Sequence, residues 1–142
     1  MSGPAAGHRE IEHTADLGFD IWAPDLPGLY SEAVGALAEL CYDRIAVLAN
    51  QQRTLRIVGG SNEERLVRWL QEIYFWLEAE SWLAAGAVDV RCDGAAVSGT
   101  VLGELYDSER HTVHTEIKAI TYHEMEIRLV GELWRTTVII DV

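Results

Sequence analysis

The stretch Thr136-Thr137-Val138-Ile139-Ile140-Asp141-Val142 at the end of the sequence guides the interpretation of the whole chain. Its unbroken run of β-branched residues predicts a buried β-strand. Asp141 and the α-carboxyl group of Val142 follow this strand directly, so two oxygen-ligand groups lie one residue apart. Such a pair is the beginning of a cation site. The simpler alternative is that Asp141 only terminates the strand.

Strands are predicted on both sides of a helical region. Alternating apolar residues place Leu17, Phe19, Ile21 and Ala23 on the inner face of one strand near the start. Turn residues at Cys92-Asp93-Gly94 predict a hairpin. Gly131-Glu132 is expected to connect the last two strands. The expected extended segments are 9–14, 17–23, 52–58, the hairpin over 88–105, and roughly 112–130 and 133–142.

Two helices are predicted, one before and one after the strand at 52–58. The first begins at Asp25-Leu26-Pro27, because proline suits the first turn, and it ends near residues 42–43. The capping box Ser61-Asn62-Glu63-Glu64 opens the second helix. This helix carries Trp69 and Trp76 away from its main apolar stripe, whereas a surface helix should show one stripe only. It is therefore either enclosed in the core or used to dock a partner.

The order of these elements predicts an α+β fold over residues 8–142, preceded by a flexible leader at residues 1–7. We expect a two-layer sandwich, with two helices packed on one face of a mostly antiparallel sheet. The chain is 142 residues long, which suffices for a single domain with its own core.

The sequence has no apolar stretch of membrane-spanning length and no signal-peptide pattern, so we expect a cytoplasmic location. Cys41 and Cys92 are expected to be buried thiols.

The charge of the chain indicates which partners it favours. Its 23 acidic and 11 basic residues give a formal charge of −12. Strong nucleic-acid binding is not expected, because that affinity comes largely from lysine and arginine residues that neutralise phosphates. The excess of carboxylates favours cations or a basic protein partner, although solubility alone would also explain it.

Three segments contain residues that could carry chemistry: His13-Thr14-Ala15-Asp16, the strand segment 117–123, and Asp141-Val142. Alternation places Lys118 and His123 on opposite faces, so the two should not act together. Lys118 could equally be a lysine that protects a sheet edge, and His123 a hydrogen-bonded, half-buried histidine. Carboxylates without paired cysteine or histidine ligands favour Ca²⁺, Mg²⁺ or Mn²⁺ over zinc.

The sequence contains no nucleophile elbow, no HExxH zinc motif and no phosphate-binding glycine loop. A stand-alone hydrolase that uses His13, Asp16 and a metal ion is therefore a weak alternative.

In the same three segments, the sequence resembles the archease family. The resemblance covers nearly everything after the leader. It rests on His13-Thr14-Ala15-Asp16, the helix segment 66–70, Gly103-Glu104, His111, the segment Lys118-Ala119-Ile120-Thr121-Tyr122-His123, and the ending 138–142. It implies a small α+β protein that is not itself the main catalyst.

The resemblance also implies a role and a set of site residues. Archeases are cofactors of the RtcB-type RNA ligase, which uses GTP and Mn²⁺ in tRNA splicing or RNA repair; they promote its guanylylation and its multiple turnover. By resemblance, Asp16, Asp141 and Val142, through the chain terminus, are metal ligands, and Lys118 is the required lysine. Ca²⁺ is the expected cation, with Mg²⁺ or Mn²⁺ as alternatives. The rival function is a chaperone-like module that binds an RNA-modifying methyltransferase.

Overall fold

The computed structural model describes residues 5–13, 16–122 and 125–142. Eight strands, two α-helices and one short 3-10 helix are found among these residues. In chain order they are β1 (Gly7–His13), β2 (Asp16–Ala23), α1 (Leu26–Cys41), η1 (Arg44–Ala46), β3 (Gln51–Val58), α2 (Asn62–Glu80), β4 (Trp82–Asp93), β5 (Ala96–Leu105), β6 (Ala119–Thr121), β7 (Arg128–Val130) and β8 (Leu133–Asp141). Residues 1–4 of the predicted leader lie outside the described residues.

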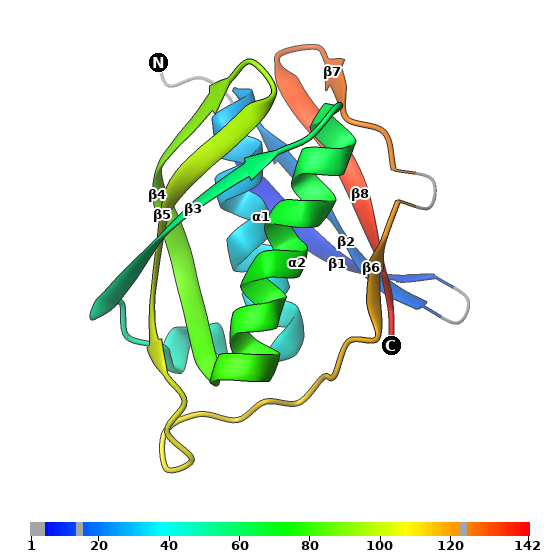
Figure 1. Ribbon diagram of the computed structural model, residues 1–142. Helices are drawn as coiled ribbons and strands as arrows, with labels where there is room; N and C mark the ends of the chain where they lie inside the picture. The colour runs from blue at the N-terminus through cyan, green and yellow to red at the C-terminus, as the bar shows by residue number, and fades with distance from the viewer. Residues whose placement is uncertain (1–4, 14–15, 123–124) are drawn as a thin grey trace.

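The described strands form two antiparallel sheets. One has the order β1-β2-β8-β6, with β7 also paired to β8, and the other has the order β3-β5-β4. Both helices lie between the sheets, and each contacts strands of both (Figure 1). The prediction of an α+β fold with mostly antiparallel strands is confirmed. The expected layering is wrong, because the strands divide into two sheets that enclose the helices.

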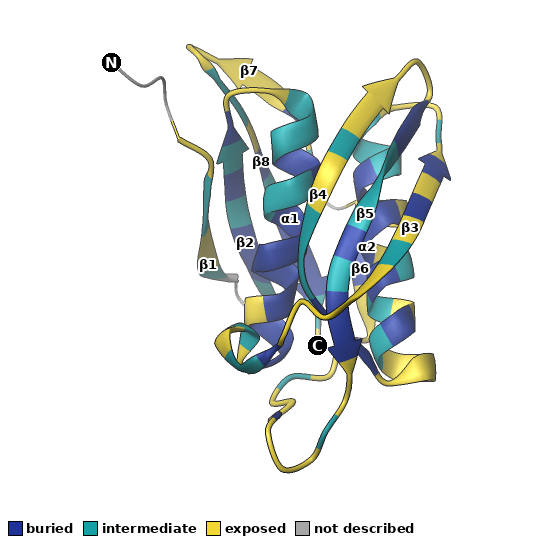
Figure 2. Cartoon of the chain, turned by 90° about the vertical axis from the view of Figure 1, so that its left-hand side faces the viewer, coloured by how far each residue is buried: buried dark blue, intermediate teal, exposed yellow. Residues whose placement is uncertain are grey.

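Burial of the helices explains their apolar surfaces. In α1, every residue from Ala33 to Ala38 is buried, as expected for a helix covered on two sides (Figure 2). Phe19, Ile21 and Ala23 of β2 pack into the same core, as predicted.

No helix among the described residues is long and apolar enough to span a membrane. Both cysteines are free; Cys41 is buried as expected, whereas Cys92 is exposed.

Capping fixes both helix starts where the sequence predicts them. The Asp25 carboxylate accepts a hydrogen bond from Gly28 N at 2.7 Å, and Ser61 Oγ accepts one from Glu64 N at 3.0 Å. The Glu64 side chain accepts a hydrogen bond from Gly60 N at 2.6 Å. Each cap satisfies backbone N–H groups that have no partner inside the helix.

The strands after α2 differ from the prediction at two places. β4 begins at Trp82, six residues before the start predicted for the hairpin, and the single long strand expected over 112–130 is absent from the described residues. Of the residues described in this segment, only those of the short strands β6 and β7 form named strands. The backbone before β6 bonds to the helices instead, since His114 N donates to Cys41 O at 2.9 Å and Ile117 N donates to Tyr74 Oη at 2.9 Å. Alternation in the sequence could not reveal these competing partners.

Candidate functional site

Three segments that are separate in the sequence, near residues 16, 118 and 141, meet at one end of the larger sheet. In the register of β2 and β8, Leu17 pairs with Ile140, so Asp16 and Asp141 lie one residue beyond this pair. On the other side of β8, Ala119 pairs with Asp141, and Lys118 N donates to Asp141 O at 2.8 Å. Figure 1 shows the chain end beside β6. The early strand β2 and the last strand β8 therefore lie side by side, although they are far apart in the sequence.

The side chains at this sheet end are accessible to a ligand or partner. Asp141 is partly exposed, Val142 is 37% exposed, and Lys118 is exposed. Among the described residues, the carboxylate of Asp141 and the ammonium group of Lys118 have no hydrogen-bond or ion-pair partner. Lys118 directly precedes β6, which is an edge strand, so the role of an edge lysine also stays open.

Other predicted site residues fall at or beyond the limits of the described structure. The backbones of His13 and Asp16 are described and form the last pair between β1 and β2, but their side chains lie outside the description. Thr14, Ala15 and His123 lie outside the described residues altogether. The structure thus brings the backbones of Asp16, Lys118 and Asp141 together, while the ligand roles inferred for Asp16, Asp141 and Val142 stay predictions.

A buried polar cluster fixes the long segment that leads to Lys118. Glu104, which is 3% exposed, accepts hydrogen bonds from both terminal nitrogens of Arg110, at 3.0 and 2.5 Å, and from Leu48 N at 2.5 Å. His111 Nδ1 accepts from Asp107 N at 2.8 Å, so the ring proton is on Nε2, which donates to Glu104 at 3.0 Å. The cluster ties residues 107–111 to β5.

Sequence reasoning assigned no role to this cluster, although Gly103-Glu104 and His111 belong to the resemblance. Gly103 is required by packing: a Cβ atom there would lie 2.0 Å from Leu83 O, closer than any real contact. The Arg110 guanidinium and then the Leu48 N–H lower the pKa of Glu104 from 4.5 to about 2.

We expect Glu104→Gln to lower the Tm at neutral pH by roughly 10 °C, because Arg110 loses its buried partner. The pKa of Glu104 is lower in the folded chain than its ordinary value, so the ionised group stabilises the fold above pH 4.5. That contribution is lost as the pH falls toward 2. Tm measured from neutral pH down to about pH 2 should show the two proteins converging. The exposed neighbour Glu109→Gln is the control; an equal effect there would contradict the prediction.

Helix α2 does not present its tryptophans to a partner. Trp69 is fully buried and Trp76 is 7% exposed, so the enclosed-helix alternative is correct for both. Trp76 packs edge-on against Trp82, with ring centroids 5.5 Å apart. Phe75 is the exposed large apolar residue of this helix, at 50%. A docking surface built on Trp69 and Trp76 is therefore excluded.

The sequence matches a known protein family over nearly its whole length. The family model for the archease protein family matches residues 8–142. The chain belongs to the archease family. A protein named archease from Methanopyrus kandleri is 37% identical over 136 residues, covering 94% of this chain and 97% of that protein. The archease of Methanothermobacter thermautotrophicus is 32% identical over 138 residues, covering 95% and 98%. These names describe a protein family rather than a reaction.

Solved archease-like structures share the fold. The solution structure of protein 1598 from Methanobacterium thermoautotrophicum is 28% identical, with a TM-score of 0.78, and the match covers 96% of this chain and 99% of that one. The crystal structure of a Thermotoga maritima protein described as an archease and possible chaperone has a TM-score of 0.66 at 21% identity, covering 100% and 98%. At that identity, the second likeness shows the fold alone.

Proposed function

We propose that this archease is an accessory protein that activates an RtcB-type, GTP-dependent RNA ligase. The observation that supports the proposal is the meeting of Asp16, Lys118 and Asp141 at one accessible end of the larger sheet. Membership of the family, over residues 8–142, adds independent support. In this role the protein promotes guanylylation of the ligase and its multiple turnover, in tRNA splicing or RNA repair.

The proposed cation site consists of hard oxygen donors. Asp16, Asp141 and the carboxyl group of Val142 would hold a divalent cation, with Ca²⁺ favoured and Mg²⁺ or Mn²⁺ as alternatives. Residues directly opposed on neighbouring antiparallel strands have Cβ atoms about 5 Å apart, so carboxylates at such positions can share one ion. Among the described residues, no protein group competes for the Asp141 carboxylate. When bound, the cation supplies positive charge to a phosphoryl-transfer centre.

Lys118 would act beside the cation and would not be one of its ligands. Its N–H group is bonded to Asp141 O, so the backbone of Lys118 is fixed next to the carboxylate while the side chain extends into solvent. An ammonium group in this place can contact a phosphate or an acidic side chain of the ligase. The net charge of −12 favours approach to a basic nucleotide-binding cleft.

The chaperone alternative has less support in this structure. One solved relative is described as a possible chaperone. The feature that favoured this role in the sequence was the broad apolar surface of α2, and burial of Trp69 and Trp76 explains that surface by packing. This alternative would be restored if the protein suppressed aggregation of an RNA-modifying methyltransferase and if variants without Asp16 or Asp141 did so equally well.

A chain extended after Val142 tests the proposal. We expect a short Gly/Ser tail at this end to reduce stimulation of multiple-turnover ligation by about tenfold, because it removes a carboxylate ligand and obstructs the exposed sheet end. The measurement compares ligation by the cognate ligase alone, with the native protein, and with the tailed protein. The same tail placed before Met1 is the matched control. Full stimulation by the protein with the C-terminal tail would contradict the role of Val142.

A further inference from the structure

A row of three directly opposed residues crosses the outer face of the smaller sheet. Ser98 of the central strand β5 pairs with Arg56 of β3 on one side and with Arg91 of β4 on the other. The adjacent row contains Thr54 and Thr100, which pair with each other. Together these residues line a shallow hollow of about 460 Å³. Two guanidinium groups therefore flank a hydroxyl-bearing strand.

A β-bulge places Arg91 in this row. Val88 pairs with Thr100 and Arg91 pairs with Ser98, so two residues of β4, Asp89 and Val90, oppose the single residue Gly99. Asp89 adopts a φ of 53°, an uncommon conformation for a residue other than glycine. In a regular strand, Val90 would occupy the outer position opposite Ser98. The bulge turns Val90 toward the core and Arg91 outward, as bulges do where a side chain is redirected.

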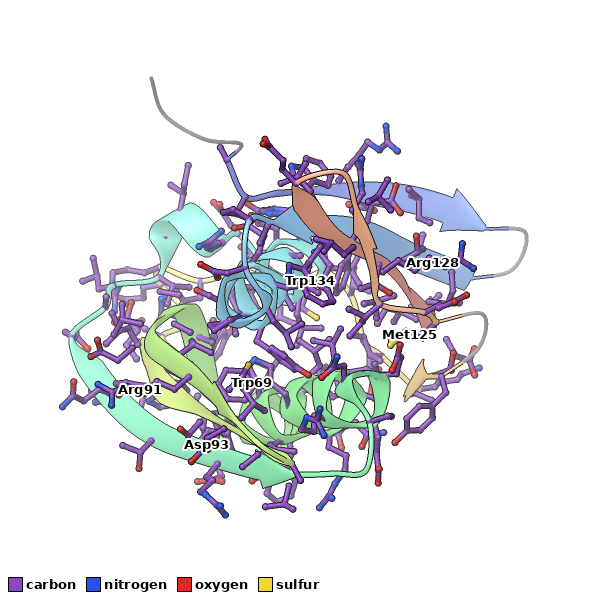
Figure 3. All side chains as sticks on the ribbon, turned by 90° about the horizontal axis from the view of Figure 1, so that it is seen from above. Trp69, Arg91, Asp93, Met125, Arg128 and Trp134 are labelled. Carbon is purple, nitrogen blue, oxygen red and sulfur yellow. The ribbon has the colours of Figure 1, made fainter. Side chains whose placement is uncertain are left out.

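Packing beneath the row holds the bulge in place. A Cβ atom on Gly99 would lie 3.0 Å from Val90 Cγ2 and 3.1 Å from Trp69 Cη2, so both side chains pack closely against the inner face at this point. Figure 3 shows Trp69 between the sheet and the helices and Arg91 at the periphery. The core packing thus holds the strained backbone at Asp89 in place, and as a consequence Arg91 faces outward.

The charges in the hollow favour an anion. Among the described residues, Arg56 and Arg91 have no ion-pair partner, whereas Arg53 is paired with Glu80 and Arg128 with Glu126. Asp89 is the one acidic residue that lines the hollow, and it also lines a neighbouring hollow over Pro27 and Ser31. Two guanidinium groups and neighbouring hydroxyls are suited to phosphate oxygens, which arginine binds in bidentate geometry.

We propose that Arg56, Ser98 and Arg91 form a binding site for the phosphate group of a small molecule, such as a mononucleotide or inorganic phosphate. A small ligand is favoured over RNA because a long polyanion would be repelled by a chain of charge −12, whereas a single phosphate responds mainly to the nearby arginines. This site lies on the other sheet from Asp141 and does not depend on ligase activation.

Amide NMR titration at low ionic strength tests the site, with inorganic phosphate and GMP as separate probes. We expect saturable shifts centred on Ser98 and its neighbours in β3 and β4. Arg56→Gln and Arg91→Gln should each weaken binding by about tenfold, since each removes a charge-assisted contact. Asp89→Asn should strengthen it by roughly threefold, because asparagine tolerates the same backbone and removes the repelling charge.

Matched controls lie in the β7–β8 hairpin, which belongs to the other sheet. Arg128→Gln and Glu132→Gln make the same charge changes and should leave phosphate binding within about twofold of the native protein. Equal weakening by Arg128→Gln would overturn the proposal, as would the absence of saturable shifts. Shifts with a single-stranded oligonucleotide but with neither small probe would overturn it in favour of an RNA surface. Since Arg56 and Arg91 are exposed, Tm values near that of the native protein are expected for both variants.

Discussion

Asp141→Asn and Asp16→Asn are each expected to lower the stimulation of ligase guanylylation by tenfold or more. Both substitutions keep the size of the side chain and remove a charged oxygen ligand, so the affinity of the proposed site for a divalent cation falls. The measurement is the rate at which the cognate ligase becomes guanylylated, with GTP and Mn²⁺ present and the archease in excess. Cation binding measured by calorimetry on the isolated variants should weaken in parallel.

Asp93→Asn is the matched control, because it makes the same chemical change at an exposed position on the other sheet. It should stimulate the ligase as the native protein does. Thermal unfolding of all variants separates a loss of ligand from a loss of fold. Native stimulation by both Asp16→Asn and Asp141→Asn would show that the acidic sheet end is not the activating site.

Trp69→Ala is expected to lower the free energy of unfolding by about 3–5 kcal/mol, the largest loss of stability anticipated for a single substitution here. The Trp69 ring is fully buried and packs edge-on against Tyr30, with centroids 6.2 Å apart. Its Nε1 donates a hydrogen bond to Tyr30 O at 3.2 Å. Truncation therefore leaves a cavity between α1, α2 and the smaller sheet, and it removes the hydrogen bond from the indole to Tyr30 O.

Denaturant unfolding followed by circular dichroism measures this loss, with Phe75→Ala as the control on the same helix. Phe75 is 50% exposed, so its removal should cost less than about 1 kcal/mol. Equal losses for the two variants would contradict the enclosed position of α2. A folded Trp69→Ala protein of native stability that fails to activate the ligase would indicate a docking role for this helix after all.

Local sequence signals predicted the elements that depend on local physics. Asp25 and Ser61 act as helix caps where they were expected, because a cap satisfies backbone groups within its own turn. The alternation of β2 was correct for Phe19, Ile21 and Ala23, since one face of that strand is buried. The long strand predicted over 112–130 failed because its backbone groups bond to Cys41 and Tyr74, which are distant in sequence.

For the candidate site, the sequence provided the residue types and the structure provided the partners. The acidic ending and the resemblance predicted Asp16, Lys118 and Asp141, but the register of β8 with β2 and β6 is what brings their backbones together. The Glu104 cluster and the bulge at Asp89 gave no local signal of their role, since each depends on contacts between strands.

The sequence by itself thus determined the two helices, the early strands, the α+β class and the chemistry available at the chain end. Only the tertiary structure decided that two sheets enclose the helices, that Trp69 and Trp76 are core residues, and that Arg91 faces outward beside Ser98. The physical reason is the separation along the chain between the groups that interact. Caps, turns and alternation act within a few residues, whereas pairing of sheets and burial of a helix depend on groups that meet only in the folded chain.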